Sequence, residues 1–306
     1  MRVLAIGEVM AEMAPTDKAG EFRLGFAGDT FNTAWYLAKS APGVTVSYLT
    51  VVGDDPISQN LIAFMRGSGI DVSFVQTSPD RTIGLYLIAL DKGERSFSYW
   101  RGQSAARTLA NDPDRLNAAM AQADVIYFSG ITLAILDPEQ RAVLLSALRD
   151  ARGQGKAIAF DPNLRPKLWA SSNEMTDVIM QGASISDIVL PSFEDEASWF
   201  NDATPQATAK RYKDAGATTI FVKNGAAPVF YAEGSKTGEV PVVPVAQVID
   251  TTAAGDSFNA GIFAGHALGM SLHDGVAHAC ALSREVVQQK GALVEIDPAA
   301  LIRKSA

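Results

Sequence analysis

Short apolar runs alternate with amphipathic stretches along most of this chain. Strands buried on both faces of a sheet are expected where almost every residue is apolar, at residues 3–7, 44–52, 125–129, 157–160, 188–190 and 219–222. Helices are expected where apolar side chains recur at helical spacing, at residues 30–40, 57–66, 139–152, 256–268 and 272–289. This order predicts an α/β fold, a three-layer sandwich in which helices cover both faces of a mostly parallel central sheet.

One region departs from this alternation. Residues 83–90 and 95–100 have extended patterns joined by a turn at 91–94, which predicts a β-hairpin with no helix between its strands. Residues 10–14 and 22–26 show the same short strand pattern.

We therefore expect a single α/β domain over residues 1–306, with a small sheet inserted at about 10–26 and 83–101. Such a sheet can serve as a lid that keeps water away from a reacting centre. A surface hairpin without a function has the same pattern and is the alternative interpretation.

The composition limits the partners of the protein. Its formal net charge is −8, and nucleic-acid binding needs a positive face, so no nucleic-acid partner is expected. An anionic substrate would need arginine or lysine side chains gathered at its site. No apolar segment approaches the ~18 residues of a membrane span. The one cysteine, Cys280, can form no intramolecular disulfide and no signal peptide precedes the first strand, so a cytoplasmic location is expected.

The strongest chemical signal lies at residues 250–261, which read Asp-Thr-Thr-Ala-Ala-Gly-Asp-Ser-Phe-Asn-Ala-Gly. Small residues at 253–255 let the backbone approach a ligand, and the first amides of the following helix lack helical acceptors. Such a helix start attracts phosphate or developing negative charge. Asp256 stands where a carboxylate can take a proton from a bound hydroxyl, which indicates phosphoryl transfer to an alcohol. A helix cap after a tight turn is the alternative interpretation.

Two further segments are suited to ligand binding. Residues 28–34 open a helix and, taken alone, indicate only an N-terminal cap. Residues 161–169 follow a strand, at the edge where ligands collect in open α/β sheets. Two prolines stiffen this loop around Asn163 and Arg165, and Arg165 can bind a carboxylate or phosphate through two parallel hydrogen bonds. A solvated surface arginine is the alternative.

Residues 250–256 resemble the C-terminal signature Asp-Thr-x-Ala-Ala-Gly-Asp of the ribokinase-like (pfkB-type) carbohydrate kinases, and residues 28–34 resemble the N-terminal signature of that family. The signatures occur in the family's order, and the resemblance covers the whole chain. It implies ATP, Mg²⁺ and the family's β-lid. It also implies a catalytic base at Asp256, an anion hole at Ala253, Ala254 and Gly255, and sugar contacts at Gly28, Asp29 and Asn32.

The hairpin carries residues that indicate the substrate. Alternation places Tyr99 and Arg101 on one face, with Tyr86 on the partner strand, and a cation beside tyrosines suits an acidic ligand. The chain resembles the subgroup of the family that acts on 2-keto-3-deoxygluconate, in which Tyr and Arg at corresponding positions hold the carboxylate of the sugar acid. Asn163 and Arg165 are expected to complete this substrate site, and the two arginines would give an acidic protein a local basic pocket.

Weaker signals concern the nucleotide. Lys223, Asn224 and Gly225 follow a strand and resemble the loop that lines the family's nucleotide site. The helix through Ala279 and Ser283 would border the adenine.

The expected metal site departs from the family's pattern. Members usually carry Asn-x-x-Glu, which orders water around magnesium, whereas residues 191–196 contain no asparagine. Glu196 is the expected equivalent, acting through water, with Asp195 or Glu194 as alternatives. The resemblance also allows a monovalent cation near Asp250 and Thr252.

The expected activity is ATP-dependent phosphorylation of 2-keto-3-deoxygluconate at its terminal hydroxyl. The nearest rival is a fructokinase or another ribokinase-like sugar or nucleoside kinase. A rival of a different class is a sugar-binding regulator that kept the fold without turnover. An apolar outer face of the lid sheet would favour a homo-oligomer formed through the lid.

Overall fold

The computed structural model describes residues 1–18, 20–91 and 94–298, and its centre is a ten-stranded sheet. The neighbouring strands, in order, are β14 (Lys236–Val240), β13 (Val229–Glu233), β12 (Thr219–Val222), β11 (Ile188–Val189), β10 (Ala157–Asp161), β9 (Val125–Ser129), β1 (Arg2–Ile6), β4 (Thr45–Gly53) and β5 (Ile70–Asp71), with β6 (Val75–Ser78) also paired to β4. Among the described strands of this sheet, only the β12–β13 and β13–β14 pairs are antiparallel.

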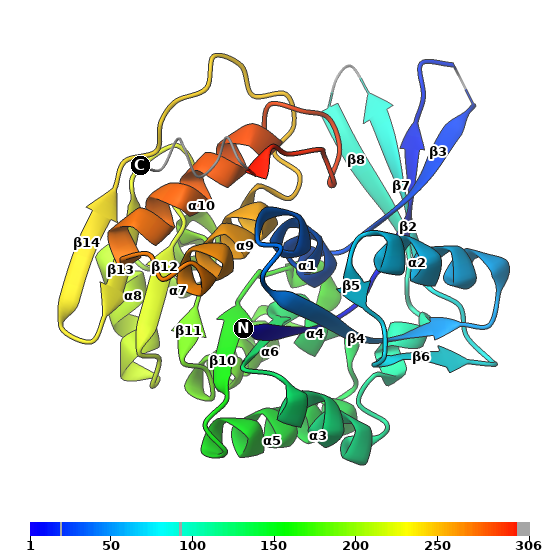
Figure 1. Ribbon diagram of the computed structural model, residues 1–306, viewed down its shortest axis with the longest axis horizontal. Coiled ribbons are helices and arrows are strands. Elements are labelled where there is room, and N and C mark those ends of the chain that lie inside the picture. The colour runs from blue at the N-terminus through cyan, green and yellow to red at the C-terminus, as the bar shows by residue number, and fades with distance from the viewer. Residues whose placement is uncertain (19, 92–93, 299–306) are drawn as a thin grey trace.

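Helices cover both faces of this sheet, and the strands alternate their side chains between two cores. Val3 and Ala5 of β1 belong to one core, whereas Leu4 and Ile6 belong to the other. The first core packs against α1 (Asp29–Ser40), α2 (Pro56–Gly67), α9 (Ala254–Ala267) and α10 (Leu272–Val286). The second packs against α3 (Pro113–Gln122), α4 (Gly130–Ile135), α5 (Pro138–Gly153), α6 (Ser172–Ser184), α7 (Phe193–Phe200) and α8 (Pro205–Asp214). The three-layer prediction is therefore confirmed (Figure 1).

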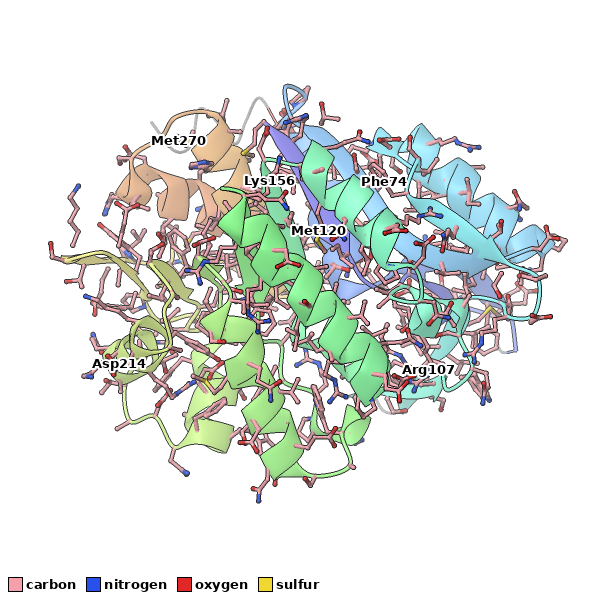
Figure 2. All side chains as sticks on the ribbon, turned by 90° about the horizontal axis from the view of Figure 1, so that it is seen from below. Phe74, Arg107, Met120, Lys156, Asp214 and Met270 are labelled. Atoms are coloured by element: carbon pink, nitrogen blue, oxygen red, sulfur yellow. The ribbon has the colours of Figure 1, made fainter. Side chains whose placement is uncertain are left out.

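The second helical layer is seen from below in Figure 2. Met120 of α3 is fully enclosed there against the sheet. Lys156, which follows α5, donates hydrogen bonds to the carbonyl oxygens of Ala121 and Ala123 at 2.7 and 2.8 Å, so the end of α5 is fixed to the end of α3. None of the described helices is long and apolar enough to cross a membrane.

A separate four-stranded sheet rises from one end of the molecule (Figure 1). Its strand order is β3 (Phe22–Ala27), β2 (Met10–Pro15), β7 (Gly84–Asp91) and β8 (Glu94–Trp100). The predicted hairpin is present as β7 and β8, although residues 92 and 93 of its turn lie outside the described residues. We call this sheet the lid and the ten-stranded sheet with its helices the body.

Most predicted elements have nearly the expected bounds, but two ends differ. α9 begins at Ala254, two residues before the predicted start, because Ala253 turns the chain with a left-handed backbone. α10 ends at Val286 and not at residue 289, and the carbonyl of Val287 instead accepts the backbone amides of Ile249 and Asp250. This contact places the segment before α9 against the end of α10.

Candidate active site

The turn that starts α9 presents free backbone amides. Ala253 has a left-handed φ of 59° and no side-chain cap. The amide of Ala254 already donates to the carbonyl of Thr251 at 3.1 Å, so the predicted three-amide anion hole loses this donor. The amides of Ala253 and Gly255 have no acceptor among the described residues. Ser283 of α10 holds the turn from behind by donating to the carbonyl of Ala254 at 2.9 Å.

Asp256 lies in the first turn of α9 and is held from α1. Asn32 Nδ2 donates to Asp256 Oδ2 at 2.8 Å, and Thr33 Oγ1 donates to the Asp256 carbonyl at 3.1 Å. Burial, followed by the negative charge of Asp29, raises the pKa of Asp256 to about 8. The Asn32 hydrogen bond and the charge of Lys223 oppose this rise. A carboxylate whose pKa lies near neutrality is suited to accept a proton.

The start of α1 depends on a close approach between two backbone segments. A Cβ atom at Gly28 would lie 2.2 Å from the carbonyl oxygen of Glu8, so only glycine fits. The Asn32 side chain accepts from the Gly28 amide at 3.3 Å while it donates to the catalytic candidate on α9. Asp29 accepts from Asn163 Nδ2 at 2.8 Å. The structure thus brings Gly28, Asp29, Asn32 and Asn163 together from two segments far apart in the sequence.

Lys223 lies in the interior beside this turn. Its Nζ pairs with Asp161 Oδ2 at 3.0 Å and contacts Asn259 Oδ1 at 3.2 Å. A Cβ atom at Gly255 would lie 3.5 Å from Lys223 Nζ, so glycine leaves the ammonium close to the free amides. Lys223 therefore adds positive charge next to the anion hole, where a transferring phosphoryl group would carry negative charge.

The remaining predicted nucleotide contacts are placed unequally. Asn224 and Gly225 lie on a turn, with Gly225 exposed and its φ at 58°. Ala279 is fully buried, and a Cβ atom at Gly261 of α9 would lie 2.9 Å from its methyl carbon. Ala279 therefore fills the α9–α10 contact and offers no surface to a nucleotide, which corrects that prediction. Ser283 is half-buried and contacts the α9 turn, as described above.

The lid presents aromatic side chains on one face. Tyr86 and Tyr99 are directly paired across β7 and β8, with ring centroids 5.8 Å apart. The Arg101 guanidinium lies 6.0 Å from the centre of the Tyr99 ring, so the two share a face as alternation predicts. The Tyr86 hydroxyl donates to Glu12 of β2, and burial together with that carboxylate raises the pKa of Tyr86. Tyr99 is 53% exposed, so this aromatic face is open to a ligand.

Both arginines that were predicted to bind the carboxylate of the sugar acid already pair with carboxylates of the protein. Arg101 pairs with Glu8, and the two side chains are 12% and 1% exposed. Arg165 lies 3.6 Å from Asp195. The positive charge of the expected local basic pocket is therefore offset by Glu8 and Asp195. The enclosed Arg101 Nε has no hydrogen-bond acceptor among the described residues, and leaving such a donor unpaired costs about 1–3 kcal/mol.

The metal prediction at Glu196 is contradicted. Its carboxylate is fully buried and accepts hydrogen bonds from Arg211 at 2.6 Å and from the Tyr212 hydroxyl at 3.0 Å, so both of its oxygens already have protein partners. Asp195 is half-buried on the other side of α7, beside Arg165, and burial raises its pKa. Successive residues on a helix point in different directions, so only one of these acids can face the site.

A cavity of about 320 Å³ lies between the lid and the loop after α10, a size suited to a small ligand. It adjoins the aromatic face through Glu12, and it does not reach Asp256. Its lining residues are Glu12, Ala14, Pro15, Thr16, Asp17, Arg23, Ile88, Lys290 and Gly291.

The loop after α10 also meets the segment before α9. Asp250 accepts from the amide of Thr252 at 3.0 Å, from the Thr252 hydroxyl at 2.7 Å and from the amide of Gly291 at 2.7 Å. These bonds connect Gly291, which lines the cavity, with the segment that leads to the catalytic candidate.

The sequence analysis gave no role to four residues of the site, Glu8, Glu12, Asp161 and Asn259. Glu8 and Glu12 could have been noticed as acids within short apolar strand patterns, where a buried charge needs a partner. Asp161 was considered only as part of the loop at 161–169, and Asn259 only as part of the helix at 256–268. Nothing in the sequence shows that Asp161 and Asn259 lie beside Lys223, because this contact joins three segments that are distant along the chain.

An α/β body, a β-lid and an aspartate beside free helix-start amides define a phosphoryl-transfer site. The chain belongs to the pfkB family of carbohydrate kinases, whose model matches residues 1–298. It is 37% identical to the 2-dehydro-3-deoxygluconokinase of Haemophilus influenzae, with 96% of each chain covered. It is 36% identical to the enzyme of that name from Escherichia coli K12, covering 96% of this chain and 97% of the relative. The crystal structure of a PfkB protein from Polaromonas matches with a TM-score of 0.83 and 27% identity over 98% of both chains.

Proposed function

We propose that this kinase transfers the γ-phosphoryl group of ATP to the terminal hydroxyl of 2-keto-3-deoxygluconate, the compound also called 2-dehydro-3-deoxygluconate. The observation that carries the proposal is Asp256, held by Asn32 within the turn that offers the free amides of Ala253 and Gly255. The names of relatives 36–37% identical over nearly the whole chain support the choice of sugar acid.

Asp256 accepts the proton of the terminal hydroxyl as its oxygen attacks the γ-phosphorus. The bond from phosphorus to the bridging oxygen of ADP breaks, and that oxygen leaves with its electron pair. The amides of Ala253 and Gly255 and the ammonium of Lys223 stabilise the negative charge on the transferring group. Asn32 orients the carboxylate by donating a hydrogen bond to Asp256 Oδ2.

The sugar acid binds between the lid and α1. Gly28, Asp29 and Asn163 supply the polar groups on the body, and Tyr86 and Tyr99 cover the sugar from the lid. Arg101 receives the carboxylate through the part of its side chain that remains exposed. Arg165, with a half-exposed side chain, adds a second positive charge near the site.

The residues present fit a magnesium–nucleotide complex. The described residues include no cluster of three potential metal ligands, and Mg²⁺ characteristically binds through one or two carboxylates, waters and the substrate phosphates. Asp195 is the acid that would hold such an ion through water, and Asn224, Gly225 and Ser283 remain the candidates beside the nucleotide. When bound, the ion neutralises phosphate charge.

Three further proposals accompany this function. The outer face of the lid exposes Phe22, Leu24 and Trp100, which supports a homo-oligomer formed through the lid. A monovalent cation near Asp250 and Thr252 would act on the α9 turn. A cytoplasmic location suits an enzyme that consumes ATP and has one cysteine.

A coupled ATP-consumption assay with 2-keto-3-deoxygluconate, gluconate, fructose and a nucleoside tests the proposal. We expect turnover with the first compound at a kcat/KM at least about tenfold above the others, and phosphate on the terminal oxygen by ³¹P NMR. Preference for fructose would identify a fructokinase. Absence of turnover with all four would favour the sugar-binding regulator.

A further inference from the structure

A buried carboxylate lies where the body meets the lid. The Glu8 side chain is 1% exposed, and its Oε2 forms an ion pair with Arg101. Its Oε1 accepts a hydrogen bond from the Ser104 hydroxyl. A buried charge is stable only where partners compensate it. Neither the sequence signatures nor the mechanism described above gives this carboxylate a role.

These residues stand at the points where the chain passes between body and lid. Glu8 lies between β1 and β2, whereas Arg101 directly follows β8 and Ser104 lies in the segment after it. Gly84, the first residue of β7, completes the contact. A Cβ atom there would lie 3.0 Å from Glu8 Oε1 and 3.2 Å from Arg101 Cβ, tighter than ordinary packing, so glycine lets the pair form.

The pair fixes one side of a flexible cation and leaves other donors available. A guanidinium carries five N–H donors in a planar arrangement, so one carboxylate on one side leaves donors for a second carboxylate. Arg101 Nε is enclosed and has no acceptor among the described residues, so a ligand would meet the part of the side chain that stays 12% exposed, beside the Nη2 that pairs with Glu8.

We infer that Glu8 is a positioning residue: with Ser104 behind it, Glu8 holds Arg101 in the orientation that receives the carboxylate of the sugar acid. This inference rests on the proposed function, because it assigns Arg101 to that carboxylate. Glu8 touches no substrate atom and acts only through Arg101. The preference for an acid over a neutral sugar then depends on a residue of the body as well as on the lid.

A double-mutant cycle tests this inference. Glu8→Gln and Ser104→Ala are made alone and with Arg101→Ala, and kcat and KM are measured for 2-keto-3-deoxygluconate and for ATP. Glu8→Gln alone should raise the KM of the sugar acid about tenfold, within the range of coupling between contacting residues, and leave the KM of ATP unchanged. In the Arg101→Ala background it should change neither KM.

Glu174→Gln is the matched control, because Glu174 pairs with Arg141 at 3.1 Å between helices outside the site. It should leave both KM values unchanged. If Glu8→Gln does not fold, Ser104→Ala keeps both charges and should give the same pattern with an effect of about threefold.

The outcomes separate this inference from the proposed function. An unchanged sugar-acid KM in Arg101→Ala overturns the carboxylate contact itself. A raised KM in Arg101→Ala together with wild-type behaviour of Glu8→Gln and Ser104→Ala overturns only the role of Glu8. An equal effect of Glu8→Gln with and without Arg101 also overturns it, because Glu8 would then act by another route.

Discussion

The start of α9 and the lid hold their functional groups in different ways. At α9, Asp256 and the free amides come from one short segment, and the side chains of Asn32 on α1 and Ser283 on α10 support them. On the lid, Tyr86, Tyr99 and Arg101 come from two strands, and Tyr99 remains more than half exposed. The difference indicates a division of roles, in which the body performs the chemistry and the lid selects the substrate.

The largest effect is expected from Asp256→Asn. The amide keeps the shape and the neighbours of the side chain but cannot accept the proton, so kcat should fall by about 10²–10⁴. The KM of the sugar acid should stay within about threefold of wild type, because a group that acts in the transition state contributes little to ground-state binding. Steady-state kinetics check this, and a kcat within about tenfold of wild type would remove Asp256 as the base.

Arg101→Ala should impair substrate binding at the lid, the second region of this comparison. Loss of a charged hydrogen bond to the carboxylate should raise the KM of the sugar acid by about 10- to 100-fold. The KM or dissociation constant of fructose, which has no carboxylate, should change far less. Equal effects on both sugars would show that Arg101 does not recognise the carboxylate of the sugar acid.

Asp195→Asn should weaken the response to magnesium. We expect about tenfold more Mg²⁺ for half-maximal activity, since loss of an outer ligand partner commonly costs 10- to 100-fold. Glu196→Gln is the neighbouring control: its carboxylate faces Arg211 and Tyr212, so it should lower Tm and leave the Mg²⁺ response unchanged. A weakened Mg²⁺ response in Glu196→Gln with a normal response in Asp195→Asn would instead assign the metal site to Glu196.

The smallest effect concerns pH. Because the base must be ionised and the pKa of Asp256 is about 8, kcat/KM should rise with pH and level off above about pH 8. Asp29 contributes to that raised pKa through its negative charge, so Asp29→Asn should move the rise to lower pH. Asp150→Asn, at an exposed position of α5, should leave the profile in place. A profile unmoved by Asp29→Asn would contradict this coupling.

The same comparison explains what the sequence could reveal. The α9 turn is contiguous, so its glycine, small residues and aspartate can be read directly as one unit. The parallel sheet and the hairpin follow from apolar runs and alternation, because every strand must bury its own faces. The choice between Asp195 and Glu196 could not be made, because it depends on the rotation of a short helix against α8.

Contacts between distant segments also escaped prediction. Glu8 meets Arg101, and Glu12 meets Tyr86, across segments that lie far apart in the sequence. The sequence did not indicate that Gly261 would cover Ala279, because that contact depends on how closely α9 and α10 pack. These are the positions where site predictions from the sequence were incomplete or wrong.

The division of roles is tested most directly by calorimetric dissociation constants for 2-keto-3-deoxygluconate with wild type, Asp256→Asn and Arg101→Ala. We predict that Asp256→Asn binds within about threefold of wild type, although it hardly turns over, and that Arg101→Ala binds at least about tenfold more weakly. Strong loss of binding in Asp256→Asn with normal binding in Arg101→Ala would contradict the account.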